Sequence, residues 1–396
     1  MAIAARPRPR QIRSGPVGWL KENLFDGWGN SVLSVLVGSL LLFIVYVAVR
    51  FLVVDGEWDV IASNRRLLFL GRYPADAIWR VWPPSLWLAF AGGLSYGIWS
   101  RLSIRELVFL GLIVAFLLAF IARGEATFLV LLATVIGGAS YVVGRRLRDT
   151  DRASRAGQVA IVAWAAFLPL GWLLLFSFGA PSSSQIGGFL LNVVLAAVAL
   201  TASLPVGIAL ALGRASRFQT LRYGCVSIIE FVRAGPLLVW IFMAQFVLPD
   251  FLPGFLGDVD LIIRVIIVLT IFTSAYIAEI VRGGLQSVPK GQVEAAEAVG
   301  LGTFTITFWI VLPQALRAVI PAMVSQLISL WKDTSLVAII GAFDLLRVSQ
   351  ATQSQPEFRG TPHEVLLFAA LMFWIVAFTM SRLSRRLEGT LGVGTR

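Results

Sequence analysis

Residues 287–317 read SVPKGQVEAAEAVGLGTFTITFWIVLPQALR, a polar stretch between two long apolar runs. Pro289 favours the start of a helix in this stretch, and Gly300 favours its end. Residues 294–296 place an acid and a smooth alanine face in between. The pattern predicts a short helix, a glycine break and a second short helix. Such a helix suits insertion into a groove on a partner protein, and the alternative is an amphipathic loop on the membrane surface.

The composition around this stretch is that of a membrane protein. Hydrophobic residues make up 58% of the 396 residues, charged residues make up 14%, and the mean hydropathy is +0.83. Soluble globular chains are about 45–50% apolar and about 25% charged. A soluble enzyme, a disordered chain and a disulfide scaffold are therefore excluded. The composition predicts an all-α polytopic membrane protein.

Ten runs are apolar enough for membrane spans, which need roughly 17–25 residues each. The third and fourth runs are short and only residues 123–125 separate them, so they form either a tight hairpin or a re-entrant pair. We therefore expect about ten transmembrane helices. The runs cover residues 31–54, 81–99, 106–122, 126–143, 158–176, 188–212, 225–248, 261–281, 319–341 and 364–380.

The basic residues predict the orientation of these helices. Of the 33 Lys and Arg residues, 22 lie in segments on the side of the N-terminus, 8 lie on the opposite side and 3 lie inside apolar runs. The positive-inside rule then places both termini and the stretch 287–317 in the cytoplasm. The segment 50–80 fits poorly, because it carries five of the eight opposing arginines. Basic residues placed between apolar runs indicate membrane orientation and not nucleic-acid binding.

The polar stretch resembles a known motif. Glu294, Ala295 and Ala296 are followed after three residues by Gly300, and after nine more by IVLP at 310–313. This spacing matches the EAA motif of ABC importer permeases, in which the motif forms the coupling helix that docks on a cytoplasmic ATPase. The resemblance assigns ATPase coupling to Glu294, Ala295, Ala296, Gly300, Leu312 and Pro313.

Three further segments narrow the family. Residues 230–240 (EFVRAGPLLVW) resemble the ExxRGTPLLVQ segment of polar amino-acid permeases, with Ala, Gly and Trp in place of its Gly, Thr and Gln. Residues 278–285 (AEIVRGGL) resemble that group's AEIxRGGI, and residues 332–336 (KDTSL) resemble its KxTSL. The resemblance covers about residues 187–386. The apolar runs before it are similar in layout to the long permease subunit of general L-amino-acid importers.

The resemblance implies an architecture and a set of partners. The five C-terminal spans would form a type I ABC importer permease core in the bacterial inner membrane, beside a second, paralogous permease subunit. Two cytoplasmic ATPase subunits would bind ATP and Mg, and a periplasmic substrate-binding protein would deliver the amino acid. This chain needs no cofactor of its own. None of its three lysines follows a glycine, so it has no Walker A loop and is not expected to hydrolyse ATP.

Metal binding is not expected either. Cys225 is the only cysteine and His363 the only histidine, so no metal site built from several such ligands is possible.

These features divide the chain into four parts. Residues 1–30 form a cytoplasmic tail, and residues 31–184 form an N-terminal membrane region of about five spans. Residues 185–386 form the permease core, with a cytoplasmic coupling loop at 282–318, and residues 387–396 form a C-terminal tail.

Charged residues inside apolar runs are costly and indicate function. Two Glu–Arg pairs are spaced three residues apart near cytoplasmic ends of runs, and each is either a structural ion pair or part of a gate. A third cluster begins beyond the middle of the ninth run and offers both charge signs to a zwitterion, or else forms a structural network. The candidate translocation or gating residues are Glu230, Arg233, Glu279, Arg282, Lys332, Asp333, Thr334 and Ser335.

The sequence therefore predicts the transmembrane permease subunit of an ATP-driven amino-acid importer. An ion-driven secondary transporter is one alternative, and it would not need the coupling stretch. A membrane-embedded enzyme is another, and it would need clustered acids or histidines inside a span.

Overall fold

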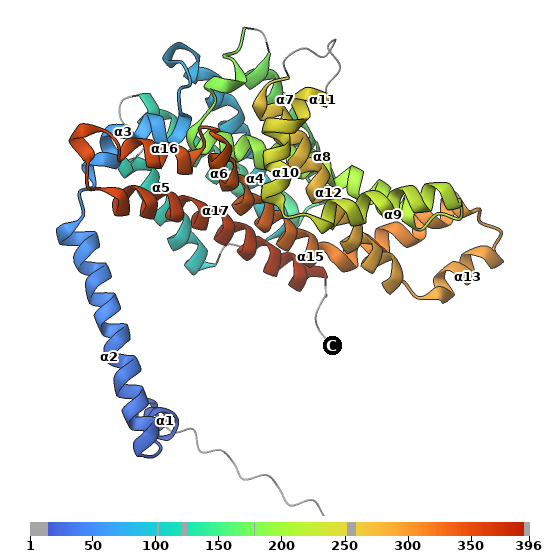
Figure 1. Ribbon diagram of the computed structural model, residues 1–396. Coiled ribbons are helices and arrows are strands. Elements are labelled where there is room, and N and C mark those ends of the chain that lie inside the picture. Colours follow the sequence, from blue (N-terminus) through green and yellow to red (C-terminus); the bar gives the residue numbers. More distant parts are fainter. Residues whose placement is uncertain (1–14, 101–102, 121–124, 178, 252–258, 392–396) are drawn as a thin grey trace, which may run out of the picture. The chain divides into compact units, whose positions relative to one another are not determined.

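The computed structural model describes residues 15–100, 103–120, 125–177, 179–251 and 259–391. Within these residues the chain consists of helices joined by short loops (Figure 1), and no β-strand forms. A single isolated bridge pairs Gly188 with Asp344. The prediction of an all-α membrane protein is confirmed. The chain divides into two compact units, residues 1–57 and residues 58–396.

The first unit contains α1 (Pro16–Leu24), α2 (Trp28–Arg50) and a π-helical turn, η1 (Phe51–Asp55), that continues α2. Arg50 is the only charged residue of α2, and its Nε lies 2.9 Å from Asp55 Oδ2. None of the side chains of α2 is buried. A helix that is apolar on every face suits a lipid environment, in agreement with the first predicted span.

Two long helices, α8 (Gly188–Arg214) and α12 (Leu261–Ser287), pack along each other at the centre of the second unit. Gly207 allows this contact, because a Cβ at that position would lie 2.6 Å from Ile277 Cγ2. α15 (Leu312–Asp333) packs on α12, and the last helix packs on α15. That helix is α17 (Pro362–Leu391).

The helices before α8 pack on one another through small residues. A Cβ at Gly144 of α6 would lie 2.6 Å from the carbonyl oxygen of Leu94 on α4. Close backbone approach at small residues is the usual way in which helices pack in lipid. The helices of this region are α4 (Trp82–Trp99), α5 (Ile104–Phe120), α6 (Glu125–Arg148) and α7 (Ala153–Phe176).

Seven of the described helices are long and apolar enough to cross a membrane, or eight if one bent pair counts as a span. This number is smaller than the ten predicted runs. The run at 81–99 is helical as α4, and the run at 106–122 is helical as α5 up to Phe120, its last two positions lying outside the described residues. The described α5 has 17 residues, and α4 contains three tryptophans and three glycines. Length and apolar content, and not helix formation, separate these two helices from the others.

The seventh predicted run, residues 225–248, is not one straight span. α9 (Gln219–Ala234) ends before Gly235, and the following segment, Leu237–Phe251, leaves at 99°. Pro236 explains the break, because proline lacks an amide hydrogen and disfavours helical geometry in the residue before it. The second segment comprises α10 (Leu237–Phe242), η4 (Met243–Val247) and α11 (Leu248–Phe251).

The second unit has two distinct ends, which the length of α8 separates by about 40 Å at 1.5 Å per residue. α3 (Asp59–Leu70) and α16 (Leu345–Thr352) lie at the start of α8. α9 and α13 (Lys290–Ala298) lie at the opposite end (Figure 1). The remaining short elements are η2 (Ala75–Val81), η3 (Ser183–Gln185), α14 (Thr303–Thr305), η6 (Ile306–Val311), η7 (Thr334–Ile340) and η8 (Pro356–Phe358).

Candidate functional site

The stretch predicted to form the coupling helix folds into α13, between two long helices. α12 continues to Ser287, and a helical run extends from Thr303 to Ile340. The segment between them is therefore residues 288–302, which is shorter than the predicted loop 282–318. The second short helix of the prediction is the first part of the helical run, because α14, η6 and α15 follow one another without a break.

Gly300 ends α13 in the way the sequence indicates. Its φ is +82°, in the left-handed region that favours glycine. The amide of Leu301 donates a hydrogen bond to the carbonyl oxygen of Ala296 at 3.1 Å, which closes the turn. The backbone at this position therefore selects glycine, whatever side chains surround it.

The six predicted coupling residues divide into two groups. Ala296 and Leu312 are buried and anchor the helices, whereas the other four are exposed: Glu294, Ala295, Gly300 and Pro313. Aromatic side chains continue the exposed surface beyond α13. The rings of Phe304 and Phe308 lie 4.5 Å apart, and Trp309 is 77% exposed. This end of the unit thus exposes the small side chains of α13 beside aromatic rings that are accessible to solvent or to a partner.

A charge cluster centred on Glu279 of α12 lies at the same end of the unit. The Glu279 carboxylate accepts a hydrogen bond from Arg282 Nη2 at 2.8 Å and forms an ion pair with Arg214, the last residue of α8. Nη1 of Arg233, on α9, lies 3.6 Å from the same carboxylate. One carboxylate therefore connects α8, α9 and α12.

The two predicted Glu–Arg pairs have different outcomes. Glu279 and Arg282 form the pair that their spacing indicates. Glu230 instead pairs with Arg214 at 3.1 Å, and Arg233 turns toward α12, where its guanidinium carbon lies 5.4 Å from the centre of the Tyr276 ring. The Nε of Arg233 is buried and has no hydrogen-bond partner.

The predicted cluster at 332–335 lies where α15 passes into η7. Lys332 is exposed and Asp333 is half-buried. Ser335 is also half-buried, and its hydroxyl donates to the carbonyl oxygen of Lys332 at 2.8 Å. Thr334 is fully buried, and its hydroxyl donates to the carbonyl oxygen of Trp331 at 2.7 Å. Within the cluster, Thr334 has a structural position, whereas Lys332 is open to a ligand or to lipid.

Sequence reasoning missed three residues of these sites. In the sequence, Arg214 is only one positive charge among many. Asn192 and Asp344 carry no predicted role, yet both are fully buried, and Asn192 Nδ2 donates to Asp344 Oδ2 at 3.2 Å. The same amide donates to Thr334 Oγ1 at 3.2 Å. For Asn192 the available signal was an amide inside the apolar run 188–212, whereas Asp344 lies three residues beyond the run 319–341.

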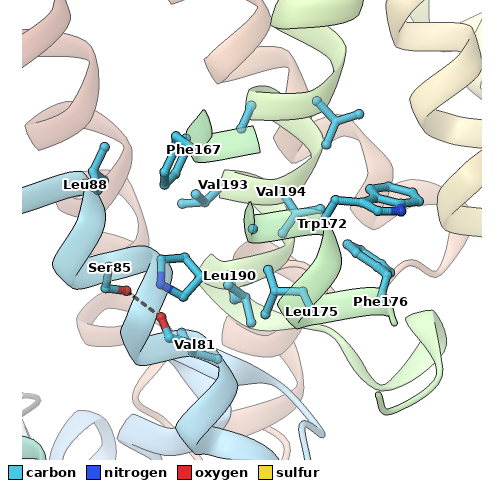
Figure 2. A pocket seen from close by; sticks show the side chains of 14 residues that line it. Val81, Ser85, Leu88, Phe167, Trp172, Leu175, Phe176, Leu190, Val193 and Val194 are labelled. Carbon is cyan, nitrogen blue, oxygen red and sulfur yellow. Dashed lines mark hydrogen bonds between the residues drawn. The ribbon is translucent and has the colours of Figure 1, made fainter. Parts of the chain in front are cut away.

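An apolar cavity of about 110 Å³ lies between α4, α7 and α8 (Figure 2). Phe167, Trp172 and Leu190 are among its lining residues, and the Ser85 hydroxyl already donates to the carbonyl oxygen of Val81 at 2.8 Å. An amino-acid ammonium and carboxylate would lack partners in it, so it does not suit a zwitterion. In the part of the chain that the structure describes, no group of three or more His, Cys, Asp or Glu side chains could hold a metal ion.

Comparison with known proteins shows the family. Residues 203–392 match the family described as binding-protein-dependent transport system inner membrane component. The chain is 35% identical over 419 residues to the glutamate/glutamine/aspartate/asparagine transport system permease protein BztC of Rhodobacter capsulatus, with 97% of this chain and 96% of that protein covered. It is 44% identical over 239 residues to the inner membrane amino-acid ABC transporter permease protein YhdY of Escherichia coli (strain K12), with 59% and 65% covered.

Among solved structures, the crystal structure of an amino acid ABC transporter with histidines matches with 28% identity and a TM-score of 0.46. That match covers 51% of this chain and 92% of the other. The sequence match to the Rhodobacter capsulatus protein extends along nearly the whole of both chains, the N-terminal helices included. The chain therefore belongs to the family of inner membrane permease components of binding-protein-dependent transport systems.

Proposed function

We propose that this chain is the permease subunit of an ATP-driven amino-acid importer in which α13 receives the movement of a cytoplasmic ATPase. The observation that carries the proposal is the exposed surface of α13, where Glu294 and Ala295 face outward while Ala296 anchors the helix. The Rhodobacter capsulatus and Escherichia coli relatives are named as amino-acid permeases, which supports the substrate class.

The assembly proposed for this function has several kinds of component. Two ATPase subunits bind ATP and Mg and perform the hydrolysis, so this chain needs no cofactor. A second permease subunit shares the translocation path, and a periplasmic substrate-binding protein delivers the amino acid. The bilayer is that of the bacterial inner membrane. Both termini and α13 then lie in the cytoplasm, in keeping with the distribution of basic residues.

The Glu279 cluster is the proposed link between α13 and the membrane helices. Glu279 lies eight residues before the end of α12, and α13 begins three residues after that end. A displacement of α13 therefore acts on α12 first, and the ion pairs of Glu279 carry it to α8 and α9. We propose the exposed Lys332 and its neighbour Asp333 as charges of the translocation path, because a zwitterion needs partners of both signs.

Two glycines of the α13 segment provide a matched test of coupling. A Cβ added at either Gly291 or Gly300 would meet no atom within 4 Å, but only Gly300 has a positive φ. A β-branched residue is strained at the positive φ of Gly300. At Gly291, inside α13, valine is a better helix former than glycine. We expect Gly300→Val to reduce ATPase co-purification and substrate uptake, and Gly291→Val to leave both unchanged.

The outcome separates the proposed function from its alternatives. Wild-type uptake by a Gly300→Val variant would contradict the coupling role of α13. Full amino-acid uptake by wild-type protein in vesicles without any ATPase would contradict the importer itself and would favour an ion-driven transporter.

A further inference from the structure

The end of the second unit opposite α13 is built partly by a helix from the N-terminal region. α3 packs against the start of α8, against α16 and against the start of α17. Its three fully buried side chains share one apolar cluster with those last two helices. The cluster contains Val60, Ile61, Leu68, Leu345, Val348, Val365, Phe368, Ala369 and Met372. α3 is therefore a structural part of the permease core, although it lies more than a hundred residues before it in sequence.

Backbone contacts hold α3 in this position. Gly71, with φ of +63°, lies so close to Gly187 that a Cβ at Gly71 would overlap the Gly187 backbone. The amide of Gly188 donates to the carbonyl oxygen of Phe343 at 2.7 Å. The guanidinium carbon of Arg72 lies 4.5 Å from the centre of the Phe343 ring. These contacts join the end of α3, the start of α8 and the segment that leads into α16.

The outer surface of this assembly is rich in arginine and poor in apolar side chains. Residues 58–81 and 341–362, all of which the structure describes, contain six arginines and four acids, and one of the acids, Asp344, is buried. Trp79 is the one large hydrophobic side chain in these two segments that is exposed. Four arginines are exposed, and we call them the arginine face: Arg66, Arg72, Arg347 and Arg359.

This surface differs from that of a helix lying on lipid. Such a helix buries large apolar side chains in the bilayer, and α9 has them, with Leu221, Ile228 and Phe231 exposed. α3 and α16 expose none. The arginines of α3 also oppose the positive-inside rule, so membrane insertion does not explain their presence. A polar surface with exposed arginines suits an acidic protein surface, because charge complementarity guides encounter and fixes register.

We propose that the arginine face is a docking surface for an acidic patch on the substrate-binding protein, and that the N-terminal region contributes α3 to it. The proposal rests on the proposed function, which places α13 in the cytoplasm and hence this end of α8 outside it. It gives a role to part of the N-terminal region, and to Arg66 and Arg72, two of the five arginines of residues 50–80 that fit the orientation rule poorly.

The test uses the complete transporter with its ATPases in lipid nanodiscs, and it measures ATPase activity against the concentration of the binding protein. Arg347 and Arg359 have exposed side chains outside the coupling and translocation residues, so we choose the double variant Arg347→Glu/Arg359→Glu. The control, Arg146→Glu/Arg155→Glu, reverses two exposed charges at the α6–α7 connection. We expect the first variant to raise the half-maximal concentration at least tenfold at low salt, with unchanged basal activity, and the control to leave it unchanged.

High salt should reduce the difference between variant and wild type, because exposed charges are screened. Substitutions of Ser63, which is exposed on α3, test whether α3 contributes to the docking surface. An added acid should repel the acidic patch and an added arginine should attract it, so Ser63→Glu should raise the half-maximal concentration and Ser63→Arg should lower it. An unchanged half-maximal concentration, or an effect seen only as altered dependence on anionic lipid, would overturn the proposal. A wild-type complex that its binding protein does not stimulate would instead refute the proposed function, and this inference with it.

Discussion

Arg214 at the end of α8 forms an ion pair with Glu279 on α12, 65 residues further along the chain. The Glu279 side chain is only 16% exposed, whereas that of Glu230, the other carboxylate within reach of Arg214, is 55% exposed. Arg233 and Arg282 also contact Glu279. Because this one shielded carboxylate attracts arginines from all three helices, it stabilises the junction of α8, α9 and α12.

Removing the charge of Glu279 should therefore destabilise the protein more than removing that of Glu230. Glu279→Gln leaves three arginines around a neutral amide, and we expect a loss of about 2 kcal/mol, below the range for fully buried pairs because the arginines are partly exposed. Glu230→Gln should cost less than about 1 kcal/mol. Unfolding of both purified variants in detergent measures the difference, and equal losses would show that solvent screens Glu279 as well.

Local spacing predicted part of this cluster and not the rest. Glu279 and Arg282 are three residues apart on one helix, so their contact follows from helix geometry. Arg214 and Arg233 reach Glu279 from two other helices. Which helices lie side by side depends on packing over the whole unit, and residue spacing contains no information about it.

The break between α9 and α10 had a local signal that hydropathy alone conceals. Hydropathy places residues 225–248 in one span, because Gly235 and Pro236 lower the mean hydropathy of this run only slightly. The backbone rule for the residue before a proline predicts an extended conformation, and Gly235 has φ −99° and ψ 147°. The position of α3 had no such signal, since the contact of Gly71 with Gly187 joins residues far apart in the chain.

Gly71→Ala should displace α3 from the core. Gly179 is a matched control, because its φ of +68° is close to the +63° of Gly71, whereas a Cβ at Gly179 would meet nothing within 4 Å. Both variants carry the strain of alanine at positive φ, about 1 kcal/mol, and Gly71→Ala adds overlap with the Gly187 backbone. We expect proteolysis of the α3 segment, followed by mass spectrometry, to be faster in Gly71→Ala only. Equal rates would mean that the backbone contact does not hold α3.

Asp344 should make stability depend on pH. Burial raises the pKa of this carboxyl from 3.8 to about 6. Between these values the folded protein retains a proton that the unfolded chain has lost, so the free energy of unfolding falls as pH rises through this window and is constant above it. The change is about 3 kcal/mol at 1.36 kcal/mol per pKa unit.

Two substitutions isolate this effect. Asp344 caps α16, because its Oδ1 accepts a hydrogen bond from the Arg347 amide at 2.9 Å. Asparagine and serine retain capping ability without a titrating carboxyl. Asp344→Asn and Asp344→Ser should both show a flatter stability profile between about pH 4 and 6 than the wild type, measured by denaturant unfolding. A profile in either variant that falls as in the wild type would assign the titration to another group.

Asn192 should contribute more to stability than a half-buried asparagine. Its amide makes three hydrogen bonds in a fully buried site, two donated to Thr334 and Asp344 and one accepted from the Leu345 amide at 3.0 Å. Asn192→Leu removes all three and takes from the buried Asp344 Oδ2 the hydrogen bond that Asn192 donates, so we expect a loss of about 3 kcal/mol. Asn64 is half-buried and accepts from Gln355 at 3.0 Å. Water can replace that partner, so Asn64→Leu should cost about 1 kcal/mol. If the two variants lose similar unfolding free energies in detergent, water also reaches Asn192. The junction of α8 with α16 would then be accessible to solvent.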